Sequence, residues 1–222
     1  MNNRVKEIIT DVEALSNWSV EIDPCKEGKT AQEIILALKA TMKEHNLVSL
    51  SAPQIGYNRR IFCLRFGDND YRTFVNPAIE NNSGMTMSRE TCTSIPDKQF
   101  IIPRFGKIKF FYTTPMGKVE SGTLVGRAAY VFQHAMDHLN GVLVSDIGLE
   151  IDELFDQATD DERAEVLKMY AESLDIRAKE LNKEIEEDKD LRDINNAIKF
   201  INSVKDGSTK LENVETEKDK KQ

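Results

Sequence analysis

The chain has 222 residues, of which 40% are hydrophobic and 31% charged, a balance typical of soluble globular proteins. No apolar run approaches the roughly 20 residues of a membrane-spanning helix, and the N-terminal residues lack the basic and apolar blocks of a secretory signal. Three cysteines give no disulfide framework and favour a reducing compartment. We therefore expect a cytoplasmic protein that makes no membrane contact.

The net charge of −8 is unevenly distributed along the chain. Residues 146–190 hold 17 acidic and 6 basic side chains, whereas the remainder holds 21 acidic and 24 basic ones. Neither part has the clustered lysines and arginines of a nucleic-acid-binding surface. We expect no direct contact with nucleic acid.

The first half of the chain predicts one helix followed by short strands. Thr30 and Glu33 have the spacing of a capping box, so we expect a helix from Thr30 to about Glu44. Its apolar face comprises Ile34, Ile35, Leu38 and Met42. Strand patterns occupy residues 47–50, 60–66 and 71–77, with a loop at 51–56 and a turn at 81–84.

The middle of the chain continues with strands and ends in a helix. Strand patterns occupy residues 100–104, 107–112 and 118–125, with a turn at 116–117. A helix is expected from about Arg127 to Asn140, because Gly141 is a plausible stop signal. Strands around one helix indicate the α+β class.

Beyond Ile151 the composition becomes acidic and helical. Thr159 and Glu162 form a second capping box, which predicts a helix reaching Glu187. An apolar seam at residues 174, 178, 181 and 185 is short for a coiled coil, so we expect a monomer whose extension docks on the body or binds a protein partner. We predict three parts: a metal-binding domain at 1–150, a helical extension at 151–204 with a second helix from 191, and a disordered tail at 205–222.

Two histidines four residues apart, His134 and His138, lie on one face of the helix expected at 127–140. They could share one metal ion there, although this spacing is also common for core histidines. Zinc hydrolases of the H-E-x-x-H type carry a glutamate general base after the first histidine. Ala135 occupies that position here, so the metal half of the motif is present and the proton-transfer half is missing.

Two upstream segments extend this pattern. Residues 51–56 read S-A-P-Q-I-G and residues 90–96 read E-T-C-T-S-I-P. In this order, and followed by the histidine pair, the segments resemble the motifs of peptide deformylases: a glycine-rich segment ending in A-A-P-Q, then E-G-C-L-S, then H-E-x-D-H. The resemblance covers about residues 1–150. It implies an α+β fold with strands around a central metal-binding helix, here with a helical acidic C-terminal extension.

The resemblance also implies a reaction and a ligand set. The reaction is removal of the N-formyl group from N-formylmethionyl peptides or nascent-chain N-termini. One divalent metal would be held by Cys92, His134 and His138, with Fe(II) expected and Zn(II), Ni(II) or Co(II) admissible. The side-chain amide of Gln54 and the backbone N–H of Thr93 would stabilise the oxyanion.

Further roles follow from the same resemblance. Residues expected to support the ligands are Glu90, Arg104 and Asp137, and a structural ion pair explains Asp137 equally well. Residues expected to bind the peptide are Val48, Ser49, Tyr130 and Val131.

Several motif positions depart from the family pattern: Leu47 and Ser49 stand at glycine positions, Ser51 at an alanine, and Thr91 and Thr93 at a glycine and a leucine. These departures favour natural divergence over a single introduced change at Ala135. We expect the chain to be inactive or strongly impaired as a hydrolase. The alternative is a non-catalytic protein of this fold with a binding or structural role in an assembly, for example in a viral particle. A zinc protease is disfavoured, since no histidine follows His138 as a third ligand.

Overall fold

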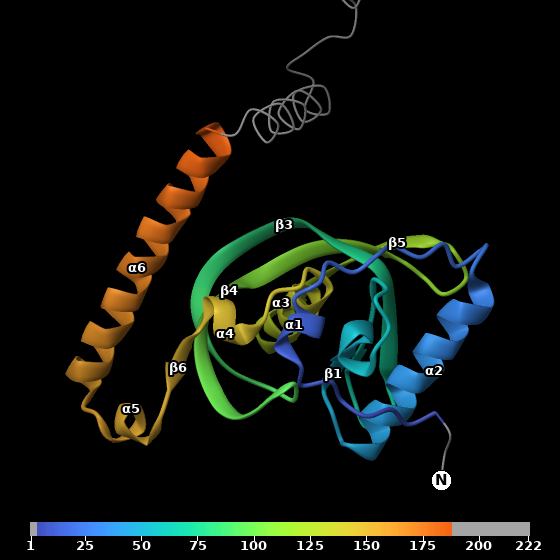
Figure 1. The fold of residues 1–222 in the computed structure, drawn as a ribbon, viewed down its shortest axis with the longest axis horizontal. Helices are drawn as coiled ribbons and strands as arrows, with labels where there is room; N and C mark the ends of the chain where they lie inside the picture. The colour runs from blue at the N-terminus through green and yellow to red at the C-terminus, as the bar shows by residue number, and fades with distance from the viewer. Residues whose placement is uncertain (1–3, 188–222) are drawn as a thin grey trace, which may run out of the picture. The chain divides into compact units, whose positions relative to one another are not determined.

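The structure is a computed structural model that describes residues 4–187 (Figure 1). Contacts within the chain group it into two units, Met1–Gln157 and Ala158–Gln222. None of the described helices is both long and apolar enough to cross a bilayer.

A six-stranded antiparallel sheet forms the body of the first unit. Its strands are β1 (Ser49–Ser51), β2 (Ile61–Arg65), β3 (Tyr71–Cys92), β4 (Ile95–Thr113), β5 (Val119–Val125) and β6 (Leu149–Ile151). They lie in the order β1-β2-β3-β4-β5, and β6 pairs with β4. Together with the helices, this sheet confirms the α+β class.

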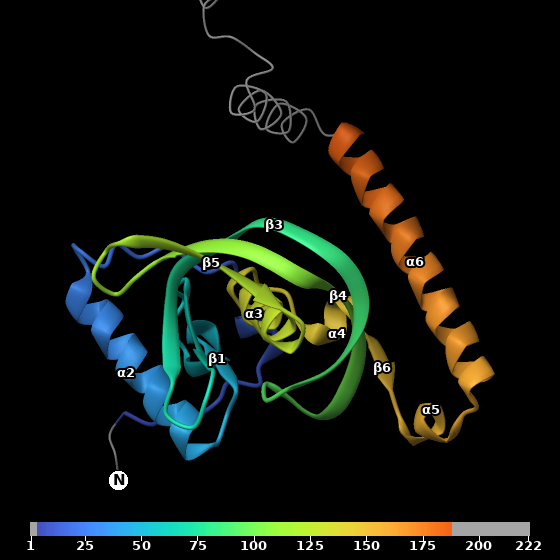
Figure 2. The ribbon, with the colours of Figure 1, turned by 180° about the vertical axis from the view of Figure 1, so that it is seen from behind.

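The first unit also contains helices, of which the two longest pack against this sheet. They are α1 (Val12–Leu15), α2 (Gly28–Glu44), the 3-10 helix η1 (Ala52–Ile55), α3 (Arg127–Leu139), α4 (Val144–Ile147) and α5 (Glu153–Gln157). Figures 1 and 2 show α3 inside the curve formed by β3, β4 and β5, with α2 beside β1. Phe132 of α3 is fully buried and packs against the rings of Phe62, Phe74 and Phe110. The apolar burial of this helix therefore fixes the direction in which its polar face points.

Helix α2 begins earlier than the capping box predicts. Its N-cap is Glu27, which makes no side-chain capping bond, and its first residue is Gly28. The Ala31 N–H donates to the Glu27 carbonyl, so Thr30 lies inside the first turn rather than ahead of it. The predicted apolar face is confirmed, since Ile34, Ile35, Leu38 and Met42 are all buried.

The turn predicted at residues 81–84 is wrong, because β3 continues through it. The strands predicted at 100–104 and 107–112 are likewise one strand, β4, paired with β3 along most of its length. Gly84, at φ +68°, and Gly106 bend the pair: a Cβ on Gly106 would lie 3.0 Å from the Gly84 carbonyl oxygen. The two glycines mark a bent hairpin rather than a chain reversal.

Other boundaries agree with the sequence. Strands β2 and β5 and helix α3 confirm the predictions for 60–66, 118–125 and 127–140. Gly141 follows α3 at φ +67°, as expected of a helix stop. The predicted loop at 51–56 instead contains β1's last residue and η1.

The described part of the second unit is a single helix, α6 (Asp160–Glu187). The Glu162 N–H donates to the Thr159 hydroxyl and the Thr159 N–H donates to the Glu162 carboxylate, which is the predicted capping box. The helix predicted at 191–204 and the tail at 205–222 lie outside the described residues, as do the side chains of most of the predicted seam.

Candidate metal centre and adjoining cavities

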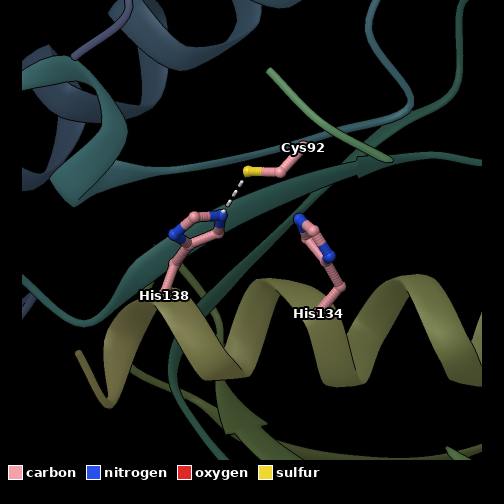
Figure 3. A group of neighbouring side chains, drawn as sticks. All are labelled: Cys92, His134 and His138. Atoms are coloured by element: carbon pink, nitrogen blue, oxygen red, sulfur yellow. Dashed lines mark hydrogen bonds between the residues drawn. The ribbon is translucent and has the colours of Figure 1, made fainter. Parts of the chain in front are cut away.

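Two elements that are distant in sequence bring together one sulfur and two imidazoles. Cys92 is the last residue of β3, and His134 and His138 lie one turn apart on α3. The ligand atoms of all three residues lie within 4.8 Å of one another, and the Cys92 Sγ is 3.3 Å from the His138 Nε2. Figure 3 shows the sulfur and one nitrogen of each ring facing a common point.

This geometry fits one small divalent metal ion. With metal–sulfur and metal–nitrogen bonds of about 2.3 and 2.0–2.1 Å, tetrahedral ligands lie roughly 3.6 Å apart. The separation of 3.3 Å between Cys92 and His138 is close to that value. A Cys-His-His set also leaves a fourth position open, as catalytic metal sites do.

A buried ion-pair network holds His134 in place. The His134 Nδ1–H donates to the Glu90 carboxylate at 3.0 Å, so its Nε2 is left to face Cys92. Arg104 donates twice to the same carboxylate, at 2.8 and 2.9 Å, and once to Asp137 at 2.6 Å. Glu90 therefore connects the guanidinium of β4 to the imidazole of α3.

The network shifts the protonation of its members. Burial acts against the Glu90 carboxylate, but its hydrogen bonds to Arg104 and His134 outweigh burial and lower its pKa to about 2. Burial likewise opposes the His134 imidazolium, yet contacts with Cys92 and Glu90 raise the pKa of His134 to about 9. Burial, aided by the charges of His134 and Arg104, lowers the pKa of His138 to about 3. His138 is thus neutral at pH 7, whereas His134 holds a proton in the metal-free cluster that a bound metal would have to displace, because a ligating imidazole must be neutral.

The loop after β1 lies beside Cys92. The Ser51 N–H donates to the Gln54 Oε1 at 2.9 Å, and the Gln54 Nε2 donates to the Ser94 hydroxyl at 3.1 Å. The same Nε2 is 3.9 Å from the Cys92 Sγ, so the amide lies beside the candidate sulfur ligand. The Ser51 hydroxyl donates to the Ala135 carbonyl at 3.0 Å, which ties this loop to α3.

One cavity opens next to His134, and a second cavity lies beside the first. The nearer one, of about 190 Å³, is lined by Val48, Ser49, Ser88, Arg89, Glu90, Thr91, Arg127, Tyr130, Val131 and His134. The second, of about 440 Å³, is lined by Val48, Leu64, Arg65, Phe66, Gly67, Asp68, Arg127, Ala128 and Val131. They share Val48, Arg127 and Val131, so the two cavities adjoin each other.

The structure brings together most residues singled out from the sequence. Val48, Ser49, Tyr130 and Val131 line the nearer cavity, and Thr93 lies in the β3–β4 turn. Four residues near the site were missed: Ser94, which holds Gln54, and Ser88, Arg89 and Arg127, which line the cavity. Arg127 precedes His134 by seven residues, so two turns of helical spacing could have indicated it. No local pattern in the sequence indicates Ser88. The turn predicted at 81–84 would end the strand before this residue, whereas β3 in fact continues through it.

With an antiparallel α+β fold around a buried Cys-His-His cluster, the chain is a candidate metallohydrolase. The family model for polypeptide deformylase matches residues 5–151. The chain belongs to the peptide deformylase family.

Relatives and solved structures agree with this assignment. The chain is 38% identical to the peptide deformylase of Thermotoga maritima over 122 residues, which are 54% of this chain and 74% of that protein. It is 38% identical to that of Thermotoga petrophila over 107 residues, 48% of this chain and 65% of the relative. A crystal structure of class I type b peptide deformylase from Acinetobacter baumannii with Met-Ala-Ser bound has a TM-score of 0.60 at 26% identity, covering 64% of this chain and 98% of that one.

Proposed function

We propose that this chain binds one divalent metal and the N-terminus of a formyl-peptide, and that it removes the formyl group poorly or not at all. The convergence of Cys92, His134 and His138 beside a cavity of about 190 Å³ carries the proposal. Fe(II) is the expected metal, with Zn(II), Ni(II) and Co(II) compatible with the same donor set. When bound, the metal would act as a Lewis acid toward the formyl carbonyl and water.

The chain's own residues would position the substrate. Besides its bond to Ser94, the Gln54 Nε2 makes only long contacts, 3.5 Å to the Thr93 hydroxyl and 3.9 Å to the Cys92 Sγ, so its second N–H and the Thr93 backbone N–H are the proposed oxyanion donors. Strand β1 ends the sheet order, and the nearer cavity lies between its Val48–Ser49 end and the Tyr130–Val131 side of α3. An extended peptide could pair with β1 there, with Ser49 restricting the space at this edge.

The missing element is a group that takes a proton from water and gives it to the leaving amine. Ala135 is buried, only 1% exposed, and has no proton to exchange. The two acids of the buried ion-pair network are engaged elsewhere, Glu90 by Arg104 and His134, and Asp137 by Arg104. Since general acid–base transfer contributes about 10²–10⁴-fold, its loss explains why turnover should be weak.

The remaining predictions belong to the same proposal. We propose that α3 is the central metal-binding helix and that residues 151–204 form an acidic extension that contacts protein rather than nucleic acid. The chain would act as a monomer in the cytoplasm, with its metal-binding domain in residues 1–150.

The test replaces the missing base. Ala135→Glu, loaded anaerobically with Fe(II) or Ni(II), should deformylate a formyl-Met peptide at least about 100-fold faster than the natural chain. Its kcat/KM should stay below about 10⁵ M⁻¹s⁻¹, because Ser49 and Thr91 still crowd the substrate edge. Ala135→Gln, of matching size without a carboxylate, is the control and should give no gain.

Two results would contradict the proposal. Full turnover by the natural chain would show that another group transfers the proton. Recovery by Ala135→Glu to 10⁵ M⁻¹s⁻¹ or above would show that Ala135 is the single lesion and that the other departures are neutral.

A second candidate function is non-catalytic binding of formyl-peptides or a structural role in an assembly. The apolar packing around the buried Ala135 favours it, since this side of α3 belongs to the phenylalanine-rich core. Peptide binding without any gain in Ala135→Glu would support this alternative.

A further inference from the structure

A third cavity lies along α2, and the proposed function makes no use of it. It has a volume of about 520 Å³, within the range of small-molecule sites. None of its lining residues belongs to the Cys-His-His cluster or lines the two cavities described above. We call it the α2 cavity, and its lining comprises Arg4, Lys6, Lys29, Gln32, Glu33, Leu36, Ala37 and Tyr57.

The charges that line the α2 cavity are unbalanced. The lining holds three basic side chains and one acid, Glu33, which gives it a net charge of +2. In the described part of the chain, no ion pair involves Arg4, Lys6 or Lys29. The Glu33 carboxylate instead accepts a hydrogen bond from the Tyr57 hydroxyl at 3.1 Å. The three cations are therefore open to an anionic ligand, on a chain whose net charge is −8.

The wall formed by residues 4–6 is fixed to the rest of the first unit. The Lys6 N–H donates to the Thr41 hydroxyl of α2 at 2.9 Å, and the Ile9 N–H donates to the Gln54 carbonyl at 2.9 Å. Figure 1 shows this N-terminal segment beside α2. Because this wall is already held in place, a ligand that binds in the α2 cavity has less of the chain to order.

The cations reach the α2 cavity from opposite ends of the helix. Lys29 lies in the first turn of α2, whereas the backbone of Lys6 is bonded to Thr41 in the last turn. Thr41 follows Lys29 by twelve residues, which is about 18 Å along the helix axis. The Lys6 side chain extends over Tyr57, with its ammonium nitrogen 5.9 Å from the ring centre. A ligand with several linked anionic groups matches this arrangement better than a single small anion.

We propose that the α2 cavity binds a small ligand that carries several linked phosphoryl groups, either an inorganic polyphosphate or a nucleoside triphosphate. Lysine and arginine side chains donate hydrogen bonds and accept none, so they suit an oxyanion with many acceptor oxygens. A chain of phosphoryl groups places several negative charges in a row, as the spread of the cations requires. The Gln32 amide and the Tyr57 ring supply neutral contacts for the rest of a nucleotide.

The experiment measures binding by isothermal titration calorimetry. The full chain is used at pH 7.5 in metal-free buffer, because polyphosphates themselves bind divalent metals. Tripolyphosphate should bind with one molecule per chain and more tightly than citrate, and its affinity should fall as salt is raised from 50 to 500 mM. Tighter binding of ATP than of tripolyphosphate would identify a nucleotide as the ligand, and the reverse order would identify inorganic polyphosphate.

Variants assign the binding to the α2 cavity. Lys6→Gln and Lys29→Gln should each weaken tripolyphosphate binding by about threefold to fivefold, as expected of accessible charge pairs. The double variant should bind more weakly than either single variant. Lys43→Gln is the matched control, because it removes a positive charge from the last turn of the same helix, outside the lining of the cavity. It should leave the affinity unchanged.

Three results would overturn the proposal. The first is no binding of tripolyphosphate at 50 mM salt, or binding that Lys43→Gln weakens as much as Lys6→Gln. The second is tighter binding of citrate, which would show that the site does not select phosphoryl groups. The third is binding of oligouridine but not of tripolyphosphate, which would assign the cations to an RNA surface. None of these results bears on the proposed function, which is tested with metal and formyl-peptides.

Discussion

Glu90 links the fold to the candidate chemistry at the scale of a single residue. Its two oxygens receive hydrogen bonds from Arg104 and His134, and all three side chains are nearly enclosed. When a carboxylate accepts a hydrogen bond from one ring nitrogen of a histidine ligand, it fixes the tautomer of the ring. It also fixes the direction of the other nitrogen, which binds the metal. The carboxylate of Glu90 therefore orients His134, without itself contacting the candidate metal position.

We expect Glu90→Gln to weaken metal binding without abolishing it. Gln retains a hydrogen-bonding oxygen but loses the charge, and supporting residues of this kind typically change metal affinity by about 10–100-fold. Competition with a chelator at pH 7.5 would give the dissociation constant. Cys92→Ser removes the thiolate ligand and should abolish stoichiometric binding. Unchanged affinity in both variants would show that this cluster is not the metal site.

At the scale of elements, the turn after α3 holds the helix against the N-terminal segment. Gly141 adopts φ +67°, and a Cβ there would lie 2.5 Å from the Ser16 carbonyl oxygen. The adjacent Ser19 N–H donates to the Leu139 carbonyl at 2.9 Å, and the Arg60 guanidinium donates to the same carbonyl at 3.1 Å. The end of the candidate metal-binding helix is thus fixed by backbone contacts that leave no room for a side chain.

Gly141→Ala should therefore destabilise the protein, by about 1–3 kcal/mol, through left-handed strain and collision with backbone. The free energy of unfolding in urea measures this. Gly28→Ala is the matched control: no atom lies within 4 Å of its added Cβ, and the position begins helix α2 at ordinary φ. It should change stability little or raise it by up to about 1 kcal/mol. An equal effect of the two substitutions would contradict the turn's role.

At the scale of the whole molecule, the three cysteines lie at different depths in the fold. Cys25 is exposed, whereas Cys63 lies in the α2–β2 core and Cys92 at the candidate metal centre. Burial raises the pKa of the Cys63 thiol to about 11, only partly offset by its contact with the Thr73 hydroxyl. The thiolate that alkylating reagents require is therefore scarce at this position.

Iodoacetamide at pH 8 should modify Cys25 first and Cys63 only on unfolding. Mass spectrometry of digests would follow each thiol over time. Cys25→Ser should eliminate the fast phase, and adding a chelator should speed labelling of Cys92 if a metal protects its sulfur. Labelling of Cys63 as fast as Cys25 in the native protein would contradict a closed core.

The sequence by itself determined the elements whose signals are local. The apolar face of α2, the stop at Gly141 and the strand patterns at β2 and β5 each depend on neighbouring residues, and all agree with the structure. The order of the three motifs also indicated the family, because ligand types and spacings are fixed by the chemistry of a metal site.

Only the tertiary structure decided what depends on distant parts of the chain. Strand β3 passes through the turn predicted at residues 81–84, because its pairing with β4 outweighs the local preference of that segment. The link from Arg104 through Glu90 to His134 joins β4, β3 and α3, and no sequence spacing encodes it. Likewise, Arg127 and Arg65 are 62 residues apart in the chain and share one cavity only after folding. Local periodicity specifies which face of an element is apolar, whereas long-range packing selects the polar side chains that meet.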